Sequence, residues 1–224
     1  MEPTEFLLPP FFDYGATFVW AVSGALVAAR TGYDIVGGFL LALATSTGGG
    51  LLRDGLFLQQ GPPVLVQSPV YLQLIVAAAV LVWFFGRYVH KMDRFNDLLR
   101  LVDAAGLGAY AVVGMSYASA AGLSALGIIL VGVVNAVGGG LLRDVIARRE
   151  PDLLRPGTLQ ALAVVAGCVV FLALTGWAET GQTPAAWTAI AVVFVLRALS
   201  PRFGLRTRPQ PGFEEYWKPG DTDR

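Results

Sequence analysis

Long apolar segments alternate with short polar connectors along most of this chain of 224 residues. Seven segments are long enough to cross about 30 Å of hydrocarbon as a helix, which takes roughly 20 residues. They cover residues 12–29, 35–57, 70–88, 104–120, 123–146, 158–175 and 185–199. Because the apolar residues are continuous and do not alternate with polar ones, they predict helices and not the strands of a membrane barrel. The pattern predicts an all-α membrane protein with seven transmembrane helices.

Composition supports a membrane protein and disfavours an enzyme. Hydrophobic residues make up 55% of the chain, charged residues 14%, and the mean hydropathy is +0.61, whereas soluble domains carry about 25% charged residues. The sequence has no phosphate-binding loop, no cluster of His, Cys and carboxylates at metal spacing and no base-nucleophile pair. We therefore expect no catalytic residue, cofactor, metal or nucleic-acid partner; the partner expected from composition is the lipid bilayer.

Basic residues predict the orientation, because short loops rich in Arg and Lys stay in the cytoplasm. With the N-terminus outside, they fall at cytoplasmic ends or connectors: Arg30, Arg87, Lys91, Arg94, Arg100, Arg148, Arg149, Arg155, Arg197, Arg202, Arg206 and Arg208. The opposite connectors, 58–69, 119–122 and 176–184, contain no Arg or Lys. The acidic N-terminus lacks the positive flank of a signal peptide. We expect a multi-pass protein of the inner (plasma) membrane with a cytoplasmic C-terminus.

An internal repeat divides the chain. The stretch GGGLLRD occurs at residues 48–54 and again at 138–144. An ungapped comparison of residues 13–54 with 103–144 finds fifteen identical positions, including Asp13 with Asp103 at the heads of the repeats. Each copy holds three spans, so the second copy enters the membrane from the opposite face. Inverted repeats of this kind are typical of transport proteins, whose ion or substrate site lies where the halves meet.

The repeat gives a five-part organisation. We predict a first three-helix repeat over 1–88, a basic cytoplasmic connector over 89–102 and a second, inverted three-helix repeat over 103–176. A seventh helix follows over 177–200, and residues 201–224 form a flexible cytoplasmic tail of mixed charge with four prolines.

The two glycine triplets, Gly48, Gly49 and Gly50 with Gly138, Gly139 and Gly140, have two interpretations. Each glycine lowers helix propensity by about 1 kcal/mol relative to Ala, so a break or kink is expected there. Carbonyls freed by a kink would replace part of a cation's hydration shell. Alternatively, small residues simply allow two helices to pack closely. The nearby Thr45, Ser46, Thr47 and Asn135 either line a polar path or hydrogen-bond back to helix carbonyls.

The charges that end the motif need compensation. Arg53, Asp54, Arg143 and Asp144 each cost about 2.5 to 3.5 kcal/mol at a helix centre. Neighbours on a helix point about 100° apart, so pairing within each Arg-Asp dipeptide is disfavoured. Partners on other spans, such as Asp13, Asp103 or the opposite repeat's carboxylate, are expected instead, or water in a pore; a structural ion pair that locks the repeats together is the alternative.

The doubled motif, the acid at each repeat head and the three-plus-three-plus-one layout carry a resemblance. Over residues 12 to about 200 the chain resembles the prokaryotic branch of the trimeric intracellular cation channels, whose bacterial members are also labelled glycine-transporter-like. The resemblance implies a homotrimer with a separate pore in each protomer, lined mainly by the first, second, fourth and fifth spans. It implies permeation of monovalent cations, chiefly potassium. The lysine-containing motif of the animal members is missing from the second span here.

Two functions are compatible with these features. The first is a potassium-permeable channel in which kinked second and fifth helices surround the pore and the arginines combine pairing with a contribution to gating. The second is an alternating-access transporter of glycine or another small zwitterion, in which an arginine holds the carboxylate. A purely structural membrane protein would show neither activity.

Overall fold

The computed structural model describes residues 8–90, 95–155, 159–178 and 180–200. Over these residues it contains eight α-helices and one π-helical segment, and no strand. The elements are α1 (Phe11–Thr31), α2 (Ile35–Leu52), the π-helix η1 (Arg53–Leu58), α3 (Val64–Gln67), α4 (Pro69–His90), α5 (Phe95–Ala120), α6 (Ala125–Ile146), α7 (Gln160–Gly176) and α8 (Gln182–Leu199). The fold predicted from the sequence, an all-α membrane protein, is confirmed.

The helices match the predicted spans in order. Six of them are long and apolar enough to cross a membrane, and α7 is a shorter apolar helix. The short α3 was not predicted, because it has four residues and follows two prolines in a segment that has the composition of a connector.

The basic connector predicted over 89–102 is largely helical. Helix α4 continues to His90 and α5 already begins at Phe95, so only residues 91–94 separate them, and these lie outside the described part. The polar residues of this stretch extend α5 beyond its apolar run, which is why hydropathy alone placed the start of the helix too late. The predicted tail, 201–224, also lies outside the described residues.

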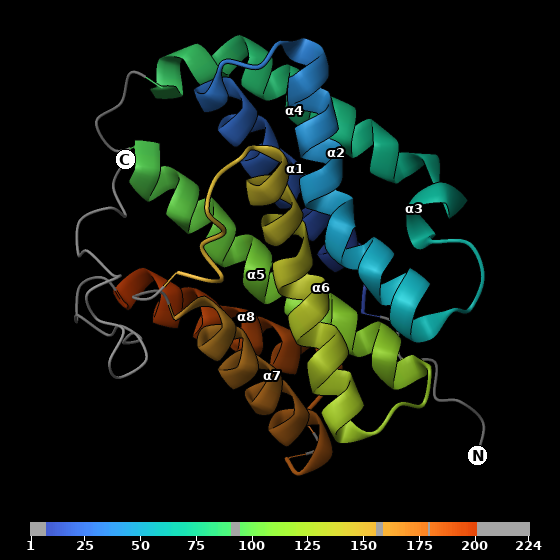
Figure 1. Cartoon of the computed structure of the whole chain (residues 1–224). Helices are drawn as coiled ribbons and strands as arrows, with labels where there is room; N and C mark the ends of the chain where they lie inside the picture. Colours follow the sequence, from blue (N-terminus) through green and yellow to red (C-terminus); the bar gives the residue numbers. More distant parts are fainter. Residues whose placement is uncertain (1–7, 91–94, 156–158, 179, 201–224) are drawn as a thin grey trace, which may run out of the picture.

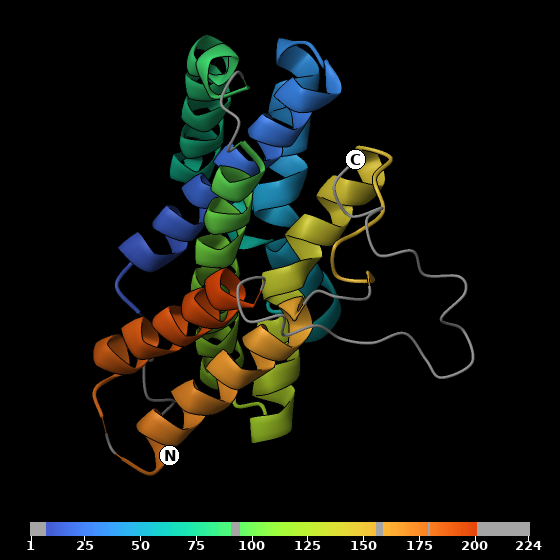
Figure 2. The same ribbon diagram turned by 90° about the vertical axis from the view of Figure 1, so that its left-hand side faces the viewer.

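Helices α2 and α6 pack against each other in the middle of the molecule (Figure 1). In the first half, α4 packs against α1 and α2; in the second half, α7 packs against α5 and α6. The halves also meet where α1 contacts α5. The additional helix α8 packs against α5 and α7, on the side of the molecule away from α4 (Figure 2).

The turns that join the first two helices of each repeat are built alike. Helix α1 is followed by Gly32 at φ 78°, and α5 is followed by Gly122 at φ 73°, backbone angles that favour glycine. Helix α2 is then capped by the Asp34 side chain, and α6 by that of Ser124. The two caps satisfy helix N–H groups at equivalent positions, so the repeat extends beyond the shared motif.

Of the break or kink expected at the glycine triplets, a break is not present in the structure. Helix α2 runs without interruption through Gly48 to Gly50, and α6 runs through Gly138 to Gly140. The first helix departs from α-helical geometry only at Arg53, whose backbone N–H still donates to the carbonyls of Gly49 and Gly50. Tertiary packing outweighs the low helix propensity of glycine here, and the carbonyls are not released for a cation.

The glycines instead allow α2 and α6 to touch backbone to backbone. A Cβ at Gly49 would collide with the carbonyl oxygen of Asn135, and a Cβ at Gly139 would collide with that of Thr45. Thr45 and Asn135 occupy equivalent positions of the two repeats, so the contacts are reciprocal, as at an isologous interface. The close-packing interpretation of the triplets is therefore the one that the structure supports.

Candidate functional site

The Arg-Asp pair of the second repeat lies in a closed network. Arg143 donates from Nη1 to Asp103 Oδ1 at 2.7 Å and to Ser23 Oγ at 2.5 Å, and from Nε to Asp144 Oδ1 at 2.9 Å. Ser23 in turn donates to Asp103 at 2.5 Å. The guanidinium carbon lies 5.8 Å from the ring centroid of Trp20. Arg143 is 3% exposed and Asp103 6% exposed, so this network ties α1, α5 and α6 together in the interior.

The Arg-Asp pair of the first repeat has different surroundings. Arg53 donates from Nε to Asp54 Oδ1 at 2.6 Å and from Nη2 to Asp54 Oδ2 at 3.1 Å. Its guanidinium carbon lies 4.0 Å from the centroid of the Tyr117 ring on α5, a cation-π contact. Asp54 also accepts the backbone N–H of Val64 at 3.1 Å, which holds the start of α3 against η1.

The expectation that neighbouring Arg and Asp would not pair is wrong in both repeats. The angle between adjacent side chains on a helix does not prevent pairing here, because the three methylene groups of arginine let the guanidinium fold back to the next residue. Among the described residues, the expected partner on another span is present in the second repeat alone, where Arg143 binds Asp103.

Asp13, the head acid of the first repeat, is not held by an arginine. Its Oδ2 accepts the hydroxyl of Tyr71 at 2.6 Å and that of Tyr117 at 3.3 Å. Among the residues that the structure describes, Asp13 forms no ion pair. The contacts of this carboxylate within the described part are therefore hydrogen bonds from tyrosine hydroxyls and not ion pairs.

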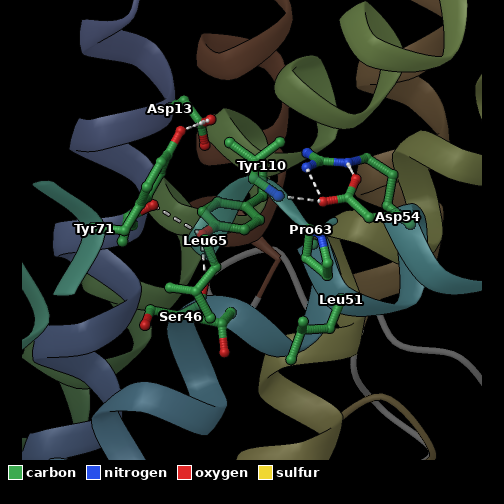
Figure 3. Close-up of a pocket in the computed structure, with 13 residues that line it drawn as sticks. Asp13, Ser46, Leu51, Asp54, Pro63, Leu65, Tyr71 and Tyr110 are labelled. Atoms are coloured by element: carbon green, nitrogen blue, oxygen red, sulfur yellow. Dashed lines mark hydrogen bonds and ion pairs between the residues drawn. The ribbon is translucent and has the colours of Figure 1, made fainter. Parts of the chain in front are cut away.

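A cavity of about 30 Å³ opens beside Asp13, between α1, α2, α5 and the segment that contains α3. Its polar lining comes from Thr17, Ser46, Thr47, Arg53, Asp54, Tyr71 and Tyr110, and Pro63, Val64 and Leu65 also line it. Figure 3 shows Tyr71 reaching Asp13 across this space, with Asp54 at another side. The volume suffices for a water or a small ion, and no metal-binding group of three or more His, Cys, Asp or Glu was found among the described residues.

Tyr110 closes one side of this cavity. Its hydroxyl donates to the carbonyl oxygen of Ser46 and lies 3.1 Å from Thr17 Oγ1. Its backbone carbonyl accepts Asn135 Nδ2 at 2.7 Å, whereas Asn135 Oδ1 has no hydrogen-bond partner among the described residues. Tyr110 is thus fixed between the two halves.

The hydroxyl groups of the polar triplet all fulfil one of the roles considered for them, hydrogen bonding back to helix carbonyls. Those of Thr45, Ser46 and Thr47 donate to the carbonyls of Leu41, Ala42 and Leu43, one turn earlier. Ser46 and Thr47 also line the cavity, where their oxygen atoms can still accept hydrogen bonds or contact a cation.

The three tyrosines at this site were not predicted from the sequence. Tyr71 lies in the apolar run of α4, and Tyr110 and Tyr117 both lie in that of α5, where an aromatic residue is an ordinary core residue. The only signal was weak: Tyr110 occupies the position that Trp20 holds in the first repeat.

Comparisons with known proteins agree with this architecture. The protein family described as glycine transporter matches residues 10–87 and 100–175, segments that correspond to the two repeats. The chain belongs to this family. It is 36% identical over 158 residues to a UPF0126 membrane protein of Deinococcus radiodurans, covering 70% of this chain and 72% of that one. The UPF0126 inner membrane protein YadS of Escherichia coli K12 is 29% identical over 200 residues, covering 89% and 95%.

Solved structures show the same fold. The TRIC trimeric intracellular cation channel orthologue from Rhodobacter sphaeroides superposes with a TM-score of 0.80 at 32% identity, covering 87% of this chain and 97% of that one. A prokaryotic TRIC channel in potassium chloride gives a TM-score of 0.79 at 26% identity, covering 87% and 96%. The chain is a member of the prokaryotic TRIC family, as its sequence resemblance predicted.

Proposed function

We propose that this protein is a channel for monovalent cations, permeable to potassium, with one pore in each protomer of a homotrimer. The observation that carries the proposal is Asp13, a carboxylate without an ion pair in the described part, beside a polar cavity within the membrane-spanning bundle. An intramembrane carboxylate is expensive unless it binds a partner, and a permeating cation supplies one. The solved relatives are described as cation channels, which supports the same assignment.

The proposed route starts at Asp13 and passes the oxygen atoms of Thr17, Ser46 and Thr47. Tyr110 obstructs it, because its hydroxyl occupies the carbonyl of Ser46 that a passing cation would use. Asn135 Oδ1, the buried acceptor without a partner in the described part, offers one more oxygen next to Tyr110. Opening of the channel then requires that Tyr110 swing away. The proposed pore therefore lies between α1, α2, α5 and α6.

The arginines repel cations unless they are neutralised. Arg53 and Arg143 each bind at least one carboxylate, so we assign them pairing as a first role. Either charge would also respond to voltage by about 2.3 kcal/mol per 100 mV if it crossed the whole field. We assign that gating role to Arg53, which only its neighbour Asp54 holds by an ion pair among the described residues. The variant Arg53→Gln should shift the voltage dependence of opening.

The competing function, transport of glycine or another zwitterion, needs an arginine that is free to bind a carboxylate. Arg53 already gives two nitrogens to Asp54, and Arg143 binds two carboxylates and a serine. Both guanidinium groups are therefore occupied, which favours the channel over the transporter.

The decisive experiment is reconstitution of the purified protein in planar bilayers under a potassium chloride gradient. We expect unitary currents that reverse near the potassium equilibrium potential, and a reduced unitary conductance at low salt in Asp13→Asn. The loss should shrink at high salt, because ions screen the local potential. The control is Asp97→Asn, which removes a carboxylate that is 65% exposed on α5. Saturable glycine uptake without unitary currents would overturn the proposal.

The location that we propose is the inner membrane, with the N-terminus and Asp13 outside and the C-terminus in the cytoplasm. The clustering of arginines at one set of helix ends supports this orientation. A single cysteine placed in the connector 59–63 should react with a membrane-impermeant maleimide in intact cells, after Cys168→Ser removes the native thiol. Labelling that occurs only after cell lysis would show that the connector 59–63 lies in the cytoplasm, which is the opposite of the proposed orientation.

A further inference from the structure

A second and larger cavity lies on the other side of Asp13, between α1, α4 and α5. Its volume is about 180 Å³. Three tyrosines and one carboxylate define its chemistry, namely Tyr14, Tyr71, Tyr117 and Asp13, and the remaining lining is mostly apolar: Leu8, Pro9, Pro10, Val113 and Ser116. We call this space the aromatic cavity. It is smaller than the roughly 300 to 1,000 Å³ of pockets for drug-sized ligands, so its occupant has few heavy atoms.

The rings are arranged to meet a cation. Tyr14 and Tyr71 lie edge to face, with centroids 5.2 Å apart and an interplanar angle of 67°, so they form two steeply inclined walls. Tyr117 already holds the Arg53 guanidinium 4.0 Å from its centroid. Ring faces carry partial negative charge, and the Asp13 carboxylate beside them forms no ion pair in the described part.

The lining selects against a bare inorganic ion. Potassium and sodium lose a strongly bound water shell on entry and need several oxygen ligands in return, whereas this cavity offers mainly ring and aliphatic surface beside one carboxylate. A quaternary ammonium ion carries its charge under methyl groups, which pack on aromatic faces while the charge attracts both the rings and the carboxylate. From this geometry we infer that the aromatic cavity binds small quaternary ammonium ions.

The second repeat lacks these features. In the repeat register, the position of Tyr14 is Ala104 and that of Tyr117 is Val27, while the acid Asp103 is bound to Arg143. The inferred site therefore belongs to the Asp13 end of the molecule alone. Since Asp13 lines both cavities, an ammonium ion bound there competes with a cation entering the proposed pore. The prediction that the bound ammonium ion blocks the pore rests on the proposed function, whereas the prediction that the ion binds does not.

Binding is tested with tetramethylammonium chloride on purified protein in detergent, by saturation-transfer NMR and by titration calorimetry at constant ionic strength. We expect saturable binding, which is at least about tenfold weaker in Tyr14→Leu and in Asp13→Asn. Tyr14→Phe keeps the ring and should bind as the wild type does. Tyr33→Leu, which removes a tyrosine near the other end of α1, is the matched control.

Two ligands of the same shape, one charged and one uncharged, test whether the cavity recognises the positive charge or only buries apolar surface. Choline should bind, and its uncharged carbon isostere, dimethylbutanol, should bind at least about tenfold more weakly. Equal binding of both ligands, or equal binding by wild type and Tyr14→Leu, would overturn the inferred site.

The bilayer experiment distinguishes this inference from the proposed function. Tetramethylammonium added on the N-terminal side should reduce the potassium current in wild type and in Tyr14→Phe, and should do so less in Tyr14→Leu. Tyrosine-dependent binding without any unitary currents would support the ammonium site and contradict the proposed channel function. Unitary currents in a protein that binds no tetramethylammonium would support the channel function and contradict the ammonium site.

Discussion

The Asp13 end and the Asp103 end of this molecule derive from one duplicated segment, yet they use the same charges differently. At the Asp103 end, the head acid, the motif arginine and a serine form one buried network. At the Asp13 end, the arginine turns to its neighbour Asp54 and to Tyr117, and the head acid faces two cavities. The motif supplies the charges, but residues outside it decide whether they lock helices together or stay available.

The largest difference between the two ends should appear on removal of the head acids. Asp103→Asn leaves Arg143 buried with one carboxylate fewer, and breaking a buried pair costs about 3 kcal/mol. Asp13→Asn removes no ion pair from the described part and should cost under about 1 kcal/mol. Thermal unfolding of the purified variants, followed by size-exclusion chromatography, measures both.

The same pair of variants should show the opposite order in conductance at low salt, where Asp13→Asn has the larger effect per folded channel. Equal destabilisation by the two substitutions would mean that Asp13 has a buried counter-charge and that the two ends do not differ as described.

The next largest effect tests what the two ends share. Gly49→Ala and Gly139→Ala each place a methyl group against a backbone carbonyl of the opposite helix, which cannot move as a side chain can. We expect each to cost about 2 kcal/mol from overpacking, with nearly equal values because the contacts are reciprocal.

Gly38→Ala is the control for this pair, since a Cβ at Gly38 on α2 meets nothing within 4 Å. Alanine has the higher helix propensity, so this variant should be neutral or slightly more stable. Tolerance of alanine at both Gly49 and Gly139 would contradict close contact of α2 and α6.

Tyr110→Phe should give a smaller change, and this change should affect the proposed pore beside Asp13 only. The substitution removes the hydroxyl that holds Ser46 and contacts Thr17. A net hydrogen bond is worth about 1 kcal/mol, which corresponds to about a fivefold rise in the open-to-closed ratio. Single-channel recording measures this ratio, and Tyr33→Phe is the control. An unchanged open probability would show that Tyr110 is not the obstruction.

Sequence alone predicted the spans and the duplication, because hydropathy, arginine placement and an exact heptapeptide repeat are local signals. The prediction failed where two helices meet. Low helix propensity favours a break at Gly48 to Gly50 in an isolated segment, but contact with α6 keeps that helix continuous.

The same limitation explains why the difference between the two ends was not foreseen. Asp13 and Asp103 are indistinguishable as repeat heads. What separates them is Ser23 on α1 in one case and Tyr71 on α4 in the other, and only the packing of spans distant in sequence brings these residues to the acids.

The smallest effect concerns the turns that follow the motif. The carbonyl of Asp54 accepts the N–H of Gln59 at 2.9 Å and that of Asp144 accepts the N–H of Arg149 at 2.8 Å, so each motif is followed by a hydrogen bond between residues five apart. Each turn contains a left-handed residue other than glycine, Gln59 at φ 49° and Arg148 at φ 55°. Glycine removes the strain of this conformation but makes the unfolded chain more flexible.

Gln59→Gly and Arg148→Gly should therefore each change the free energy of unfolding by no more than about 0.5 kcal/mol. The two variants should differ in their effect on conductance. Gln59 leads into the segment of α3 that lines the cavity beside Asp13, whereas Arg148 follows Arg143, which the buried network holds in place. Single-channel recordings of the two proteins should show altered open-time distributions in Gln59→Gly only. Altered open times in both variants, or in Arg148→Gly alone, would show that the Asp103 end takes part in gating. Either result would contradict the roles assigned to the two halves.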